Sequence, residues 1–176
     1  KMLKELNTPI LFLIFNRPDT TQCVFNVIKA VKPKALYVAA DAPRQHVPGE
    51  AEDCSAARAI IEQVDWECEV HRLYRDKNLG CRVAVSSAID WFFEHVEEGI
   101  ILEDDCVPNQ SFFWFCQELL EKYRFDERVM HISGSNYQFG RKVGEASYYY
   151  SRLAHIWGWA TWRRAWKHYD VNMSKF

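Results

Sequence analysis

Several features that mark particular protein classes are missing from this sequence. Its six cysteines include no Cys-x-x-Cys pair and no clustered Cys/His spacing, which argues against a zinc site and favours reduced thiols in a cytosolic protein. No glycine-rich phosphate-binding loop occurs. The longest wholly apolar run, Ile10 to Phe15, is too short to cross a bilayer, and the N-terminus has no signal-peptide core. We therefore expect a cytoplasmic protein without a transmembrane segment.

An excess of charge of one sign is also absent. Lys and Arg number 22 and Asp and Glu 24, so the net charge is −2, and no basic stripe stands out to bind a nucleic-acid backbone. A hydrophobic content of 48% excludes general disorder and is ample for a core. The length of 176 residues predicts a single domain.

Short apolar runs alternate along the chain with segments of helical spacing. The runs predict strands at 10–15, 35–40, 68–73, 99–102, 129–133 and 148–153. Helices are predicted between the first four strands, after Asn109, and through the late tryptophans. The run at 68–73 alternates more than the others, which places it closer to a sheet edge. Repeated strand–helix–strand crossovers predict an α/β fold of three layers, with a mostly parallel sheet and helices on both faces.

The segment from Gly99 to Pro108 carries the strongest functional signal. Three apolar residues run directly into Glu103, Asp104 and Asp105. A cluster of adjacent carboxylates at the carboxyl end of a strand suits Mg²⁺ or Mn²⁺, which in turn bridges to substrate phosphates. The alternative is a solvated acidic turn.

Polar residues also follow the first two predicted strands. Asn16 and Arg17 follow the first, and Asp41 follows the second. In a parallel sheet these positions share one edge with the acidic triplet and can converge on a ligand. Arg17 beside a helix start suits a phosphate, or else forms an ordinary surface salt bridge. Asp41 suits a base N–H, or else caps the following loop.

Two later segments offer weaker candidates. Asn78 and Arg82 flank Gly80 at a turn into a helix and could reach a diphosphate. Four tryptophans occur between 157 and 166, three of them at helical spacing that is typical of a core. Trp157 and Gly158 precede that predicted helix, where an exposed indole could stack on a sugar.

Together these residues resemble the nucleotide-diphospho-sugar transferases of the GT-A fold. The likeness is to N-acetylglucosaminyltransferase I and to a bacterial hemolytic-protein-like group of sugar transferases, and it covers about residues 8–166. It rests on Ile14-Phe-Asn-Arg-Pro18, Asp41, Asn78-Leu-Gly80, Glu103-Asp-Asp105 with Val-Pro after it, Ser133-Gly-Ser-Asn136 and Trp157-Gly-Trp159.

The resemblance implies roles for these positions. Asp105 would bind the divalent metal, Mn²⁺ or Mg²⁺, that grips the diphosphate of a UDP-sugar. Glu103 and Asp104 would contact the ribose, base or sugar, Arg17 the phosphates and Asp41 the uracil ring. The expected substrate-binding set is Phe15, Asn16, Arg17, Asp41, Asn78, Arg82, Glu103, Asp104, Trp157 and Gly158. The implied activity is an inverting hexosyltransferase of polysaccharide biosynthesis, acting on a glycan or other hydroxyl acceptor.

One departure from the family concerns the catalytic base. The relatives place a carboxylate beyond the Trp-Gly-Trp region, whereas this sequence ends at Phe176. No catalytic residue can be named, so we expect a donor-binding core over about 8–140 and an acceptor-side segment over about 141–176 of a truncated chain. The alternatives are a non-catalytic nucleotide-sugar or glycan-binding module, and a phosphoacceptor receiver domain. The latter would need an acidic pair where this chain has Asn16 and Arg17.

Overall fold

The computed structural model of the chain describes residues 5–142 and 144–174. Its strands are β1 (Ile10–Ile14), β2 (Ala35–Ala40), β3 (Glu69–Tyr74), β4 (Glu98–Glu103), β5 (Ile132–Ser133) and β6 (Trp159–Trp162). Its helices are α1 (Pro18–Val31), α2 (Glu50–Ala59), the 3₁₀ helix η1 (Ile60–Gln63), α3 (Cys81–His95), α4 (Ser111–Lys122) and α5 (Arg163–Trp166). None of the helices in these residues has the length and apolar content needed to span a membrane.

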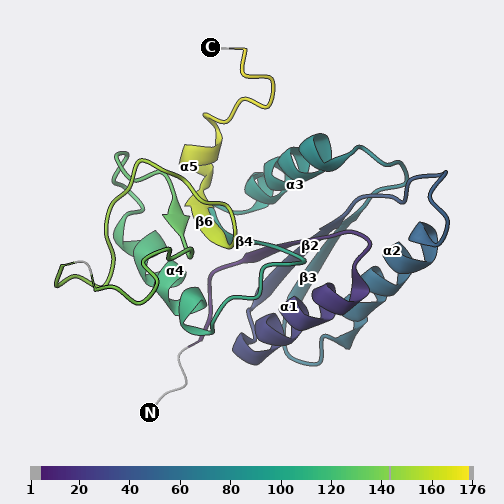
Figure 1. The fold of residues 1–176 in the computed structure, drawn as a ribbon, viewed down its shortest axis with the longest axis horizontal. Helices are drawn as coiled ribbons and strands as arrows, with labels where there is room; N and C mark the ends of the chain where they lie inside the picture. Colours follow the sequence, from purple (N-terminus) through teal and green to yellow (C-terminus); the bar gives the residue numbers. More distant parts are fainter. Residues whose placement is uncertain (1–4, 143, 175–176) are drawn as a thin grey trace.

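The strands form one six-stranded sheet in the order β3-β2-β1-β4-β6-β5 (Figure 1). The pairs β1–β2, β2–β3 and β1–β4 are parallel, whereas β6 pairs antiparallel with both β4 and β5. The edge position predicted for the third strand is confirmed, since β3 pairs only with β2. The α/β architecture with a mostly parallel sheet is likewise confirmed.

Helices cover both faces of this sheet and create two cores. Successive residues of β1 point to opposite faces, so Phe12 joins one core while Leu11 and Leu13 join the other. The core around Phe12 is closed by α1, η1 and α4. The core around Leu11 is closed by α3, with the short α5 packed against its margin (Figure 1). The result is the expected three-layer arrangement.

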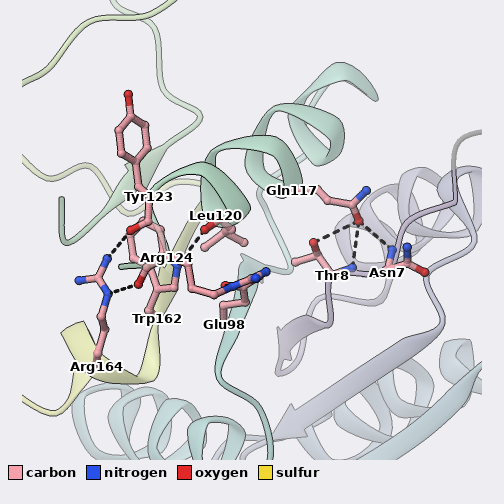
Figure 2. A network of polar contacts seen from close by, with 9 residues as sticks. All are labelled: Asn7, Thr8, Glu98, Gln117, Leu120, Tyr123, Arg124, Trp162 and Arg164. Carbon is pink, nitrogen blue, oxygen red and sulfur yellow. Dashed lines mark hydrogen bonds and ion pairs between the residues drawn. The ribbon is translucent and has the colours of Figure 1, made fainter. Parts of the chain in front are cut away.

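Helix α4, which follows the acidic triplet, is fastened to two neighbouring segments by residues of its second half (Figure 2). The side-chain oxygen of Gln117 accepts the backbone N–H groups of Asn7, at 2.7 Å, and Thr8, at 3.1 Å. The indole N–H of Trp162 donates to the Leu120 carbonyl at 3.1 Å. These bonds tie α4 to the segment before β1 and to β6.

The carbonyl groups at the end of α4 converge on one arginine. Arg164 donates from Nε to the Arg124 carbonyl at 2.8 Å and from Nη2 to the Tyr123 carbonyl at 2.9 Å (Figure 2). Nη2 also donates to the carbonyl of Val129, beyond the helix, at 2.9 Å. A cation suits the carboxyl end of a helix, where carbonyls lack partners within the helix.

We therefore expect Arg164→Met to lower the free energy of unfolding by about 2 kcal/mol, because it strands several carbonyls that a charged donor satisfied. Urea unfolding followed by circular dichroism measures the change. Lys167→Met is the control, since Lys167 is exposed and its side chain has no partner in the described residues. Equal effects of the two substitutions would contradict this role of Arg164.

The C-terminal region departs from the sequence-based expectation. The tryptophan segment was predicted to be helical, but Trp159 to Trp162 is a strand and only one helical turn follows. The predicted burial is right, because Trp159 and Trp162 are 8% and 1% exposed. Trp159 packs in one core and Trp162 in the other. In a strand that is buried on both faces, apolar residues need not alternate with polar ones.

The predicted strand at 148–153 is wrong. This segment pairs with no strand of the sheet, and Tyr149 and Tyr150 are 53% and 70% exposed. The predicted strand at 129–133 exists only as Ile132–Ser133. Aromatic alternation alone mimics a half-buried strand, and here the tyrosines project from a long connection instead.

Candidate functional site

The carboxyl ends of the parallel strands form one edge of the sheet. Ile14 pairs with Ala40, and Ala40 pairs with Tyr74, while Leu13 pairs with Glu103. The connections leaving this edge run in opposite directions along the sheet, since β1 leads through α1 to β2 on one side, whereas β4 leads through α4 towards β5 and β6 on the other. Such a divergence between neighbouring strands, here β1 and β4, opens the crevice where α/β sheets bind ligands.

A buried carboxylate joins the two sides of this crevice. Asp104 is 2% exposed and accepts the backbone N–H of Phe15 at 3.2 Å, and Arg17 Nη2 donates to it. Burial raises the pKa of Asp104, while the charge and hydrogen bonds of Arg17 oppose that rise. The loop after β1 is thereby bound to the loop after β4.

Arg17 bridges the last two acids of the triplet. Its Nη1 donates to Asp105 at 2.9 Å, while Nη2 donates to Asp104. Partial burial disfavours the charged guanidinium, but the attraction of the two carboxylates outweighs it and raises the pKa of Arg17. The Asp105 side chain is 48% exposed, against 4% for Asp104. Asp105 is therefore the most exposed member of the triplet.

Glu103 occupies a third environment. As the last residue of β4 it points to the same face as Ile101, opposite to Leu102. Burial is the main cause that raises the pKa of Glu103, and the charges of Asp105 and Asp104 raise it further. Its carboxylate has no hydrogen bond or ion pair with any residue the structure describes. The three acids thus diverge, and no group of three His, Cys, Asp or Glu side chains in the described residues is placed to hold a metal ion.

Neutralising Arg17 should expose the cost of burying Asp104. We expect Arg17→Gln to lower the free energy of unfolding at neutral pH by about 2 kcal/mol, less than for a fully buried pair because Arg17 is half exposed. Adding Asp104→Asn should recover part of the loss, because the buried charge is then gone. Chemical denaturation measures both variants, and Arg82→Gln serves as the exposed control. Simple additivity of the two substitutions would contradict the coupling.

Two residues that the sequence did not reveal organise the neighbouring loop. Glu50 begins α2 and is 2% exposed; it accepts the backbone N–H of Arg44 at 2.6 Å and the Asn16 side-chain N–H at 2.9 Å. The Arg44 guanidinium also donates to this carboxylate. These hydrogen bonds, chiefly from Arg44, lower the pKa of Glu50 to about 2. No periodicity distinguishes a buried acid at a helix start from an exposed one.

This shift predicts a specific pH dependence. Because folding lowers the pKa of Glu50 from 4.5 to about 2, its stabilising effect is complete above pH 4.5 and is lost as the pH falls towards 2. The difference in unfolding free energy between the wild type and Glu50→Gln should shrink over that interval. Thermal unfolding at several pH values tests this. Glu52→Gln, an exposed neighbour in α2, should show no such trend, and a pH-independent Glu50→Gln difference would contradict the assignment.

The candidate residues that follow β2 and β3 are joined by hydrogen bonds between the two loops. The carboxylate of Asp41 accepts the backbone N–H groups of Leu79, at 2.9 Å, and Gly80, at 3.0 Å. The side-chain N–H of Asn78 donates to the Ala42 carbonyl at 2.6 Å. Asp41 therefore fixes the loop at 78–80, whereas the alternative named for it was a cap of the loop that directly follows it. Arg82, in the first turn of α3, is exposed and its side chain has no partner among the described residues.

An open cleft of about 1310 Å³ begins at Asp105 and extends away from the parallel strands. Its walls come from α4, from the segment around β5 and from the long connection before β6. Trp157 and Gly158 line it, and the Trp157 side chain lies at the surface, with the residue 68% exposed. Trp157 therefore lies outside the core, unlike Trp159 and Trp162.

The candidates therefore fall into three groups. Phe15, Asn16, Arg17, Asp104 and Asp105 lie together at the β1–β4 crevice. Asp41, Asn78 and Arg82 lie along the same edge at β2 and β3, and Trp157 and Gly158 lie in the cleft. Asp105 belongs both to the crevice and to the cleft, while Glu103 faces away from Asp104.

Comparison with known proteins bears on the fold alone. No family model and no curated protein sequence matches the chain. In three dimensions it resembles 4-diphosphocytidyl-2C-methyl-D-erythritol synthase from Anaerococcus prevotii, with a TM-score of 0.53 and 9% identity over 98% of this chain and 80% of that one. HddC from Yersinia pseudotuberculosis gives a TM-score of 0.48 over 92% of this chain and 80% of its own, at 8% identity, or 9% for its complex with GMP-PN. The synthase shares the Rossmann-like α/β sheet, which agrees with the architecture found here.

Proposed function

We propose that this chain binds a nucleotide-diphospho-sugar, with uridine as the expected base, and belongs to a metal-dependent glycosyltransferase. The observation that carries the proposal is the position of Arg17 and Asp105. A guanidinium and a half-exposed carboxylate sit together at the strand-end crevice, and a large cleft opens beside them. The guanidinium of Arg17 and a cation bound to Asp105 would hold a diphosphate. The cleft would accommodate the sugar and its acceptor.

The phosphate side of the site is built from Arg17. Its planar guanidinium matches phosphate oxygens, and helix α1 begins at the next residue, where backbone N–H groups lack partners within the helix. Asp104 remains buried beneath it and keeps the guanidinium in place. Asp41 and Asn78 keep the loop at 78–80 against the same edge. The proposed contacts of Asp41 with the base and of Asn78 with the diphosphate therefore start from an ordered loop.

The metal side of the site is Asp105. Mg²⁺ and Mn²⁺ commonly take one or two carboxylates and complete their coordination with substrate phosphates and water, so a single accessible carboxylate beside a phosphate site fits such an ion. When bound, the cation would neutralise the charge that builds on the diphosphate as the sugar–phosphate bond breaks. Asp105 would then exchange its contact with Arg17 for the metal.

The acceptor side is the cleft that contains Trp157 and Gly158. Asp105 is the only carboxylate among the described residues that line it, so we assign no catalytic base to this chain. That observation favours a second candidate, a binding module for nucleotide-sugars or glycans on the same fold. The inverting outcome follows from the family resemblance alone.

Isothermal titration calorimetry with UDP, with and without Mn²⁺, tests donor binding. We expect the wild type to bind about tenfold more tightly with Mn²⁺, and Asp105→Asn to lose this gain because a neutral amide is a poor ligand for a hard cation. Asp53→Asn, an exposed acid on α2, should behave as the wild type. Metal-independent binding, or an unchanged gain in Asp105→Asn, would contradict the assignment of Asp105.

Turnover separates the two candidates. A transferase should release UDP from a UDP-sugar, by transfer or by slow hydrolysis, whereas a binding module should bind the donor and leave it intact. Formation of pyrophosphate from UTP and a sugar phosphate would instead assign nucleotidyl transfer, the chemistry suggested by the name of the diphosphocytidyl synthase with which the fold is shared.

A further inference from the structure

The charged residues that line the cleft are nearly all basic. They are Arg128, Arg141, Lys142 and Arg152, against Asp105 as the one acid in the described lining. The chain as a whole carries a net charge of −2. The described lining of the cleft is therefore more positive than the chain as a whole.

Two of these cations already have partners. Arg128 pairs with Asp126 at 2.7 Å, and Lys142 pairs with Glu145 at 3.2 Å. Arg141 and Arg152 are exposed, and neither guanidinium has a hydrogen bond or ion pair with any residue in 5–142 and 144–174. Each guanidinium is a planar group of N–H donors suited to a carboxylate or a phosphate. Both residues line the cleft, and neither is paired with an acid of the described residues.

The same cleft exposes flat aromatic surface. Tyr149, Tyr150 and Trp157 are 53%, 70% and 68% exposed, and all three line it. A hydrogen bond joins the hydroxyl groups of Tyr150 and Tyr123, and the Tyr148 hydroxyl accepts a hydrogen bond from Lys122 at 2.6 Å. Side chains with an apolar face and a polar rim suit ligands with the same character, as a sugar ring has.

We propose that the cleft takes an acidic saccharide, an acceptor whose sugar units carry carboxylate or phosphate groups read by Arg141 and Arg152. The role of this saccharide as an acceptor rests on the function proposed above, whereas its binding to the cleft does not. A neutral glycan would use the aromatic rings and leave both guanidinium groups unpaired. A nucleic acid would favour a protein with an excess of positive charge, whereas the net charge of this chain is −2.

The test compares ligands that differ only in charge. Oligogalacturonate and its methyl ester share a backbone, and mannose 6-phosphate and mannose form the phosphate pair. Calorimetry without nucleotide should show about tenfold tighter binding of one acidic member than of its neutral partner. The pair that responds identifies carboxylate or phosphate as the charged group.

Variants locate the effect. Arg141→Gln with Arg152→Gln should abolish the preference for the acidic ligand and leave Mn²⁺-dependent UDP binding unchanged. Arg72→Gln, which removes one positive charge from the edge strand β3, should retain the preference. Equal binding of acidic and neutral ligands, or the same preference in the double variant, would overturn this inference. So would tighter, equally Arg141- and Arg152-dependent binding of a single-stranded oligonucleotide or polyglutamate.

These results are independent of the proposed function. Failure of UDP to bind, together with a preference for acidic saccharides that depends on Arg141 and Arg152, would reject the donor site and leave a glycan-binding module. Metal-dependent UDP binding without that preference would reject the acidic acceptor alone.

Discussion

The buried carboxylate of Asp104 is the constraint on which the arrangement of the site depends. An ionised carboxylate in the interior is tolerated only with a charge partner and hydrogen bonds, and here both come from the loop after β1, through Arg17 and the Phe15 N–H. The two loops that flank the crevice therefore cannot separate without leaving this charge unpaired. Because Asp104 turns inward, the next residue, Asp105, turns out towards solvent.

The same chemistry is repeated along the strand-end edge. Glu50 gathers the loop at 44–50 and Asn16, and Asp41 gathers the loop at 78–80. Each loop is thus ordered by an acid that accepts N–H groups, before any ligand arrives. The consequence for binding is selective: an incoming phosphate would compete for Arg17 with Asp105, whose carboxylate is half exposed and screened, and not with Asp104, whose carboxylate is buried.

The sequence was sufficient where burial alone decides the structure. Residues 35–40 were predicted as a strand with the bounds that β2 has, because a fully apolar run between a proline and an acid leaves little choice. The sequence misled where one spacing suits both a helix and a strand. Trp159 and Trp162 are three residues apart, which would place them on one face of a helix, but they point to opposite faces of a strand. The sequence placed Arg17, Asp104 and Asp105 at one crevice through the strand-end rule. The ion pair of Glu50 with Arg44 was not predicted, because it depends on the geometry of the loop between them, which no local sequence pattern encodes.

The floor of the cleft explains why the proposed donor and acceptor sides meet at a single residue. The Gly134 N–H donates to the Gly158 carbonyl at 3.0 Å, and a Cβ on Gly134 would lie 2.5 Å from the ring of Phe112. Phe112 belongs to α4, which the chain enters directly after the acidic triplet. Close approach of these backbones over Phe112, possible with glycine and not with larger residues, brings the cleft up to the strand-end crevice. Asp105 is thus the residue that lines the cleft and also accepts a hydrogen bond from Arg17 at the strand-end crevice.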